Sequence, residues 1–284
     1  MKAIIPAAGM GSRFLPATKA QPKEMLPVVD KPVIQYIVEE AIDTNVDEVV
    51  IVSKASKASI EQQFAEDEAL VAQLRANGKD AYADAVEAAG NLNVSFVYQD
   101  NPLGLGHAVY AAADKTADEP FIVMLGDVIV PDNTICPKLL EISKEHDGAS
   151  VIAVVPVPDE QVSRFGIIGG ADLGGGVWKI DKMVEKPSLE DAPSNLAIFG
   201  RYLLTPKVME LLAHTPVGAG GEIQLTDALV ELLQHEDVYA YVINPEEGHD
   251  TGTVETWLEA NIKLAMRNSK LADSLKSSLS SLFV

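Results

Sequence analysis

Short apolar runs alternate with helix-like stretches through the first half of this 284-residue chain. The runs contain many β-branched residues, and they predict strands at residues 2–8, 49–52, 94–98 and 121–125. Between them, apolar residues at helical spacing predict helices at residues 33–42, 56–64 and 107–113. Strands that alternate with helices imply a parallel sheet that is covered by helices on both faces, with right-handed crossovers. The chain is therefore predicted to be an α/β protein.

The pattern changes after residue 148. Longer strands are predicted there at residues 149–157, 177–184 and 196–204, and the end of the chain reads as helix, strand, helix at residues 226–233, 238–243 and 254–266. We expect this half to extend the same sheet. Residues 1–268 are therefore predicted to form one domain.

Two segments are predicted to lie at the periphery. Residues 65–90 are rich in Ala, Asp and Glu and predict a helical insertion, and residues 269–284 predict a C-terminal helical tail. The tail carries an apolar stripe at helical spacing, made of Leu271, Leu275, Leu279 and Leu282. This stripe either packs on the body of its own chain or contacts another subunit.

The formal net charge of −20 limits the partners of the chain. Such an acidic protein is a poor candidate for tracking a nucleic-acid backbone or for binding an anionic membrane surface. The first 31 residues are an exception, because five basic and two acidic side chains give them a charge of +3. A small basic island in an acidic protein suggests a compact polyanionic ligand.

Cys136 is the only cysteine, which excludes an intramolecular disulfide framework and a cysteine zinc cluster. We expect a buried thiol without a chemical role. No apolar run approaches the roughly 18–20 residues that span a bilayer, and the apolar start is too short for a signal peptide. The chain is therefore expected to be cytoplasmic, with no membrane partner and no nucleic-acid partner.

A glycine-rich loop follows the first predicted strand. Gly9 and Gly11 let the backbone approach a phosphate closely, and Arg13 and Lys23 can neutralise a polyphosphate from two directions. The loop lacks the Gly-Lys-Ser/Thr ending of a Walker A motif, and Phe14 stands where a dinucleotide fingerprint needs its third glycine. Two further segments, residues 99–106 and 126–127, also follow strands, and such sheets bind ligands at the carboxyl ends of their strands.

The run from Gly9 to Pro27 resembles the signature loop of the sugar-1-phosphate nucleotidyltransferases. The resemblance extends over essentially the whole chain, through residues 103–108, 125–127, 184–187, 200–202 and 249–252 in the order of that family. Residues 218–227, Gly-Ala-Gly-Gly-Glu-Ile-Gln-Leu-Thr-Asp, are similar to the bacterial members that transfer uridylyl groups to glucose 1-phosphate. The resemblance implies a Rossmann-like three-layer α/β/α nucleotidyltransferase fold with a central, mostly parallel mixed sheet. Residues 1–148 would mainly bind the nucleotide, and residues 149–268 the sugar.

The resemblance also implies roles for single residues on the nucleotide side. The uracil would be surrounded by Ala8, Gly9, Gln99 and Gly104, and Gly11 would belong to the same substrate site. Gln99 suits this role because its amide offers a donor and an acceptor side by side, as the imide edge of uracil requires. An ordinary polar residue at a strand end is the alternative for Gln99.

A metal site is implied by two carboxylates. Asp127, at the end of a predicted strand, would bind Mg²⁺, because carboxylate oxygens beside phosphates are typical magnesium ligands. Asp250 is a second candidate ligand, and it could instead orient a water or the sugar. His249 is expected to be structural, because magnesium prefers oxygen.

The sugar side is implied by a neighbouring pair. Glu185 would hold a glucose hydroxyl and Lys186 the sugar phosphate, which requires the strand to bend or end there, since neighbours on a strand point in opposite directions. A surface ion pair is the alternative. The sugar pocket would be completed by Gly166, Gly200 and Glu222.

The reaction implied is an in-line attack of glucose 1-phosphate on the α-phosphorus of UTP, with Mg²⁺ as the cofactor and no covalent intermediate. Arg13 and Lys23 would face the triphosphate and Lys186 the sugar phosphate, so these three are the predicted catalytic residues. UTP and glucose 1-phosphate are the expected partners, together with further copies of the chain in a dimer or tetramer.

Other functions stay open at this point. An enzyme of the same fold that uses dTTP differs only in what it must recognise, a 5-methyl group and a missing 2′-hydroxyl. A catalytically inactive nucleotide-sugar sensor would be expected to lack some of the catalytic side chains, and all of them are present. A dehydrogenase is disfavoured by the missing third glycine.

Overall fold

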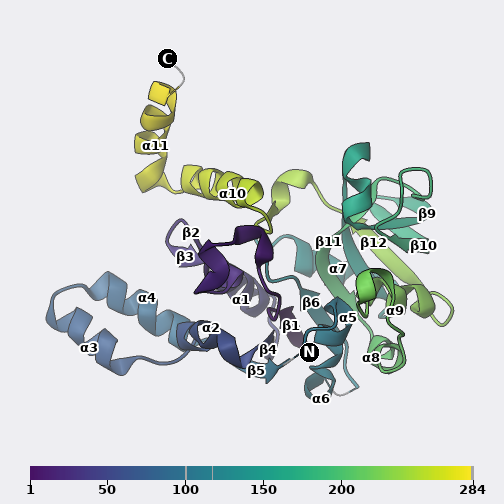
Figure 1. Cartoon of the computed structure of the whole chain (residues 1–284), viewed down its shortest axis with the longest axis horizontal. Coiled ribbons are helices and arrows are strands. Elements are labelled where there is room, and N and C mark those ends of the chain that lie inside the picture. Colours follow the sequence, from purple (N-terminus) through teal and green to yellow (C-terminus); the bar gives the residue numbers. More distant parts are fainter. Residues whose placement is uncertain (100, 117, 283–284) are drawn as a thin grey trace.

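The computed structural model describes residues 1–99, 101–116 and 118–282, and a nine-stranded sheet runs through this part of the chain (Figure 1). The strand order is β5-β4-β1-β6-β11-β8-β12-β10-β9. The sheet is mixed and carries helices on both faces, which is the three-layer α/β arrangement predicted from the sequence.

The first half of the chain supplies the parallel part of the sheet. Its strands are β1 (Lys2–Pro6), β4 (Glu48–Ser53), β5 (Val94–Tyr98) and β6 (Phe121–Met124), and all neighbouring pairs among them are parallel. These four strands confirm the predicted ones. Because both faces of the strands are covered, their sequences are nearly continuous apolar runs rather than alternating ones.

The helices divide between the two faces of the sheet. One face packs against α1 (Val33–Asp43), α2 (Ala58–Gln63), α7 (Ile135–Glu145) and α10 (Val254–Arg267). The other face packs against α5 (Leu105–Tyr110), α8 (Lys207–Leu212) and α9 (Leu225–Leu232). A short helix, α6 (Ala113–Thr116), follows α5. Of these helices, α6, α7 and α8 had no counterpart in the sequence-based prediction.

The second half of the chain supplies mainly antiparallel pairs. Its strands are β8 (Ser150–Pro156), β9 (Gly166–Gly174), β10 (Val177–Glu185), β11 (Leu196–Leu204) and β12 (Val238–Val242). Only β12 and β8 are parallel neighbours within this group, and β11 joins the group to the first half through β6. Strand β9 was not predicted. It pairs with both β10 and β11, so the far end of the sheet curls back on itself.

Two short ribbons and two peripheral segments complete the fold. The ribbons are β2 (Pro27–Val28) with β3 (Lys31–Pro32), and β7 (Val128–Ile129) with β13 (His249–Asp250). The segment predicted as a helical insertion folds into α3 (Glu68–Ala76) and α4 (Asp80–Gly90), which project from the body in Figure 1. The C-terminal tail forms α11 (Ser269–Leu282), which follows α10 and lies at the edge of the molecule.

Two further expectations concern single features. Cys136 is fully buried in α7, as predicted. Within the described ranges, none of the helices has the length and hydrophobicity needed to cross a bilayer.

Candidate active site

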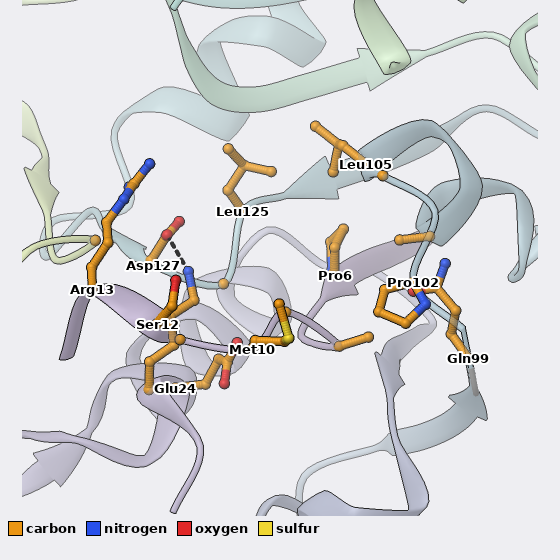
Figure 2. Close-up of a pocket in the computed structure, with 18 of the residues that line it drawn as sticks. Pro6, Met10, Ser12, Arg13, Glu24, Gln99, Pro102, Leu105, Leu125 and Asp127 are labelled. Atoms are coloured by element: carbon orange, nitrogen blue, oxygen red, sulfur yellow. Dashed lines mark hydrogen bonds and ion pairs between the residues drawn. The ribbon is translucent and has the colours of Figure 1, made fainter. Parts of the chain in front are cut away.

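A cavity of about 520 Å³ opens at the carboxyl ends of β1, β5 and β6 (Figure 2). We call it the main cavity, because most of the predicted site residues line it. The segments that follow these three strands all contribute to its lining, and the second half of the chain adds Glu222 and Gly252. Figure 2 shows Arg13 and Asp127 at one end of the cavity and Gln99 with Pro102 at the other. The cavity therefore has a charged end and an end suited to a planar, neutral group.

The loop after β1 forms the wall of the charged end. Gly11 has a φ of 65°, and a Cβ there would lie 3.2 Å from the Cβ of Lys23 and 3.3 Å from Cγ2 of Thr18. The hydroxyl of Thr18 donates to the Gly11 carbonyl at 2.7 Å. Any side chain at position 11 would be both strained and crowded, so glycine is needed here for the fold of the loop.

Lys23 and Asp127 meet at this end of the cavity. The ammonium Nζ of Lys23 lies 2.5 Å from Oδ2 of Asp127. Burial by itself raises the pKa of Asp127, but the charges of Lys23 and Arg13 outweigh it and hold that pKa below its ordinary value. Asp127 is therefore a carboxylate at neutral pH. Arg13 forms no ion pair within the described part of the chain, so its charge remains available to an anion.

A second carboxylate lies beside the first. Asp250 is in β13, which pairs with β7, so Asp250 is opposite Val128. A Cβ at Gly252 would lie 3.0 Å from Oδ1 of Asp250 and 3.2 Å from Oδ2 of Asp127, so both carboxylates border one point. Burial, and then the negative charge of Asp127, raises the pKa of Asp250 above its ordinary value. A cation between the two groups would relieve both effects.

The donor set at this point is small. Among the described residues, no group of three or more His, Cys, Asp and Glu side chains is placed to hold a metal ion. Two carboxylates suit Mg²⁺, which usually takes one or two carboxylates together with waters and substrate phosphates. His249 is buried next to Asp250, and burial followed by the charge of Lys263 lowers its pKa. This histidine is therefore a neutral, packed side chain.

Gln99 is at the other end of the cavity and is 3% exposed. Its amide Nε2 makes a short contact with Nδ1 of His107, a residue of α5. Its Oε1 is buried and has no hydrogen-bond partner within the described ranges. Gly104 directly precedes α5 and has a φ of 112°, and a Cβ there would lie 2.6 Å from the Ile223 carbonyl. Glycine is thus needed at position 104, because any side chain would be strained and would collide with the segment around Ile223.

Sequence reasoning missed a buried ion pair under the loop. Glu24 lines the cavity and is 1% exposed, and its Oε2 accepts from Nζ of Lys57 at 2.9 Å. Burial raises the pKa of Glu24, and the charges of Lys57 and Lys23 oppose this shift. Glu24 directly follows Lys23 in the recognised loop, but burial of a carboxylate leaves no local signal in a sequence.

Three of the proposed sugar residues, Gly166, Glu185 and Lys186, lie together outside the main cavity. Strand β10 ends at Glu185, opposite Gly166 of β9, and Lys186 has a φ of 46°. The bend lets both side chains reach the same side, as their suggested roles require. Oε2 of Glu185 accepts from the hydroxyl of Thr226 at 2.7 Å, and Oε1 lies 3.0 Å from Nζ of Lys186. Glu185 borders a second cavity, of about 690 Å³.

Gly200 and Glu222 connect to the main cavity differently. Gly200 has a φ of 90° and packs on Leu125, whose side chain would be 2.8 Å from a Cβ at position 200. Leu125 lines the main cavity, whereas Gly200 lies behind it. Glu222 lines the cavity itself, close to Gly104. The structure thus brings Glu222 to the nucleotide side and leaves Gly166, Glu185 and Lys186 as a separate cluster.

The basic island of the first 31 residues does not act as one unit. Lys2 pairs with Glu48 at the opposite end of the sheet, and Lys31 pairs with Glu39 of α1. Arg13 and Lys23 are the members that line the main cavity. Strand β1 separates Lys2 from Arg13 and Lys23, because Lys2 is at the start of this strand and the loop follows its end.

Comparison with known proteins places the chain among nucleotidyl transferases. The model of the nucleotidyl transferase family matches residues 2–267. The UTP–glucose-1-phosphate uridylyltransferase of Bacillus subtilis strain 168 is 44% identical over 277 residues, which cover 96% of this chain and 94% of that protein.

Solved structures with the same fold include two described with ligands. The UTP-bound UGPase from Acinetobacter baumannii has a TM-score of 0.90 and 36% identity, over 99% of both chains. A UDP-glucose pyrophosphorylase complexed with UDP-glucose has a TM-score of 0.85 and 37% identity, over 94% of this chain and 99% of that one.

Proposed function

The chain belongs to the nucleotidyl transferase family, and from this premise we propose that it converts UTP and glucose 1-phosphate to UDP-glucose and pyrophosphate. Relatives that carry this activity in their names match it over nearly their full length, which supports the choice of substrates. The resemblance recognised from the sequence is confirmed by these matches. The observation that carries the proposal is a single cavity with a charged end and a neutral, amide-bearing end.

In the proposed complex, UTP lies along this cavity. The uracil occupies the end with Gln99, Gly104 and Ala8, where the unpaired Oε1 of Gln99 is an acceptor that matches the N3–H of uracil. The triphosphate lies toward Arg13 and Lys23, beside the backbone of Gly9 and Gly11. The roles of these residues are proposals that rest on their positions.

The chain's own residues then have a positioning task. Two anions must meet in line, so positive charge and fixed geometry lower the barrier more than any nucleophile of the protein could. Arg13 neutralises the leaving pyrophosphate. Lys23, whose nitrogen lies 2.5 Å from Asp127, can exchange this contact for one with a phosphate, since both partners are anions. No proton has to be taken from a phosphate that is already ionised.

The sugar phosphate is proposed to bind through Lys186, and the sugar through Glu185. The side chain of Lys186 is 53% exposed although it pairs with Glu185, so its ammonium can turn toward a phosphate at little cost in packing. Gly166 leaves room beside Glu185, since a Cβ there would lie 3.1 Å from Oε2 of that carboxylate. Glu222 would border the sugar from the side of the main cavity, and Gly200 would lie behind Leu125 there.

Asp127 and Asp250 fit Mg²⁺, and we propose that they hold it. When bound, Mg²⁺ would supply positive charge to the phosphate oxygens in the transition state. Asp127 is kept ionised by its basic neighbours, and Asp250 contributes a second oxygen donor across the β7–β13 ribbon. A homo-oligomer and a cytoplasmic location stay predictions.

A pyrophosphate-release assay tests the proposal. The purified chain is mixed with UTP, dTTP, CTP or ATP and with glucose 1-phosphate or other sugar phosphates, with and without Mg²⁺. We expect Mg²⁺-dependent release that is fastest with UTP and glucose 1-phosphate. Faster release with dTTP favours the thymidylyltransferase alternative, and no release with any pair favours a nucleotide-sugar sensor.

A further inference from the structure

Arg201 is the largest fully buried side chain of the described residues, and it lines neither of the two cavities described above. It is in β11, directly after Gly200, at a place where the register between β11 and β8 shifts. Its Nε donates to Oε1 of Glu40 at 3.0 Å, and its Nη2 donates to Oε2 at 2.6 Å. Glu40 is in α1 and is 3% exposed, so this is a two-pronged ion pair inside the core.

The remaining donors of the guanidinium reach the backbone around Asp127. Nη2 donates to the Val128 carbonyl at 2.7 Å, and Nη1 donates to the Gly200 carbonyl at 3.2 Å. The same Gly200 carbonyl accepts the N–H of Leu125 at 2.9 Å. The turn from Leu125 to Val128 is therefore held at both of its ends, and Asp127 is inside it.

The second carboxylate is tied to the same turn. The carbonyl of Asp127 accepts the N–H of Thr251 at 2.7 Å and its hydroxyl at 2.8 Å. Val128 is paired with Asp250 in the β7–β13 ribbon. A displacement of the turn would therefore move Asp127 and Asp250 together.

A gain in stability does not by itself explain why this ion pair is buried in the core. Taking two charges out of water costs about as much as their attraction returns, and well-packed apolar residues of similar volume often stabilise a core equally well. An apolar side chain cannot donate to the Val128 and Gly200 carbonyls. Compared with an apolar pair, the ion pair thus adds hydrogen bonds of fixed direction, and these hold the turn that carries Asp127.

We propose that Arg201, held by Glu40, is a positioning residue that fixes the turn carrying Asp127 and with it the Asp127–Asp250 carboxylate pair. This inference rests on the proposed function of that pair. It differs from a stabilising role, because it predicts that metal binding and turnover depend on Arg201 even in a protein that is as stable as wild type.

The test replaces the pair by apolar residues, Glu40→Met with Arg201→Met, which removes both buried charges at once. The matched control is Lys2→Met with Glu48→Met, an ion pair of 3.2 Å at the opposite end of the sheet. Each double variant leaves the net charge unchanged. Thermal melting reports stability, steady-state kinetics report kcat and KM, and electron paramagnetic resonance of Mn²⁺, with and without UDP-glucose, reports metal binding without turnover.

We expect both double variants to melt within a few degrees of wild type. In Glu40→Met/Arg201→Met, kcat should fall about 10- to 100-fold and Mn²⁺ affinity about tenfold, because misplaced groups and lost supporting hydrogen bonds have effects of this size. The KM for UTP should change far less, since the uracil end is untouched. The control should keep wild-type kcat and Mn²⁺ affinity.

A folded Glu40→Met/Arg201→Met variant with wild-type kcat and Mn²⁺ affinity overturns the inference. If that variant does not fold, Arg201→Lys decides, because it keeps the charge but lacks the planar fork that reaches Glu40 and both carbonyls. Wild-type kcat and Mn²⁺ affinity in Arg201→Lys overturn the inference as well. Wild type that binds Mn²⁺ but releases no pyrophosphate refutes the proposed function instead, and the Mn²⁺ comparison still tests the positioning.

Discussion

The charged end of the main cavity and the cluster at the end of β10 contain the same types of side chain, yet they are held very differently. Asp127 and Lys23 are partly enclosed and paired with each other, and Asp127 is on a turn that is fixed at both ends. Lys186 is half-exposed and its ion-pair partner is its own neighbour, Glu185. The first region is preorganised, whereas in the second the lysine is free to reorient when a ligand arrives.

This difference predicts where substitutions should reduce catalysis most. In a preorganised region the removal of one group leaves its buried partner unpaired, and the geometry of the others shifts. In an exposed pair the removed contact is weakened by solvent from the start. We therefore expect the effects on catalysis to decrease from the charged end of the cavity to the β10 cluster, the uracil end and the C-terminal tail.

The largest effect is expected for Asp127→Asn. A neutral amide is a poorer magnesium ligand and offers Lys23 no negative charge to pair with. We therefore expect kcat to fall about 100-fold or more, while the melting temperature stays near that of wild type. Asp132→Asn, at an exposed carboxylate paired with Arg267, is the control and should keep its activity. Near-wild-type turnover at limiting Mg²⁺ would remove Asp127 from the metal site.

The two proposed phosphate-binding lysines sharpen the comparison directly. A charged contact is worth roughly 1.5–3 kcal/mol, so Lys186→Ala should lose about tenfold to a hundredfold in kcat/KM and raise the requirement for glucose 1-phosphate. Calorimetric binding of UTP without the sugar should weaken much more in Lys23→Ala than in Lys186→Ala. The control is Lys182→Ala, because Lys182 is an exposed lysine of β10, the strand that ends directly before Lys186.

The opposite pattern would reverse the two roles. If Lys186→Ala loses UTP binding while its dependence on glucose 1-phosphate is unchanged, the cluster at the end of β10 belongs to the nucleotide. The distinction between a nucleotide region and a sugar region would then be wrong.

A smaller effect is expected at the uracil end. Gln99→Ala should weaken UTP binding about tenfold and relax the preference for UTP over CTP, because a site that reads a base by hydrogen bonds rejects the wrong one by leaving polar groups unpaired. Calorimetry with both nucleotides measures this, with Gln73→Ala in the peripheral helix α3 as the control. An unchanged preference would exclude Gln99 as the residue that reads the base.

The smallest effect on catalysis is expected from the tail. Leu271 is 41% exposed and Leu275 and Leu279 are half-buried, while the side chain of Leu282 lies outside the described residues. We propose that this stripe contributes to a homo-oligomer, so truncation after Asn268 should reduce the particle size in light scattering and leave kcat per chain unchanged. A monomeric full-length protein refutes the oligomer. An unchanged oligomer after truncation refutes only the proposed contribution of the leucine stripe to it.

The sequence predicted the first half of the fold better than the second. Strands β1, β4 and β6 of the first half are buried on both faces, so their apolar runs are a local signal that can be recognised without knowing their neighbours. Strand β9, Gly-Ile-Ile-Gly-Gly-Ala-Asp-Leu-Gly, has a glycine-rich sequence typical of a loop, and it is a strand because β10 and β11 lie beside it. Helix α7 is different, because its buried residues stand at helical spacing and its sequence therefore carries the local signal of a helix.

The candidate site divides in the same way. Gly9, Gly11, Arg13 and Lys23 stand close together in one segment, so the sequence alone could indicate a phosphate loop and exclude a Walker A motif. The burial of Glu24 with Lys57 could not be predicted. These residues are 33 positions apart, and a carboxylate becomes buried only when the surrounding elements have packed over it.

The amino-acid sequence alone shows which chemical groups this protein has, in which order, and after which strands they stand. Which of these groups come into contact depends on the tertiary structure. Lys23 and Asp127 are 104 residues apart, and Glu40 and Arg201 are 161 residues apart, yet each pair is in contact. Local propensities and motifs depend on neighbours in the chain, whereas such contacts depend on how the whole sheet and its helices pack, because packing sets both the distance between two charges and their exposure to water.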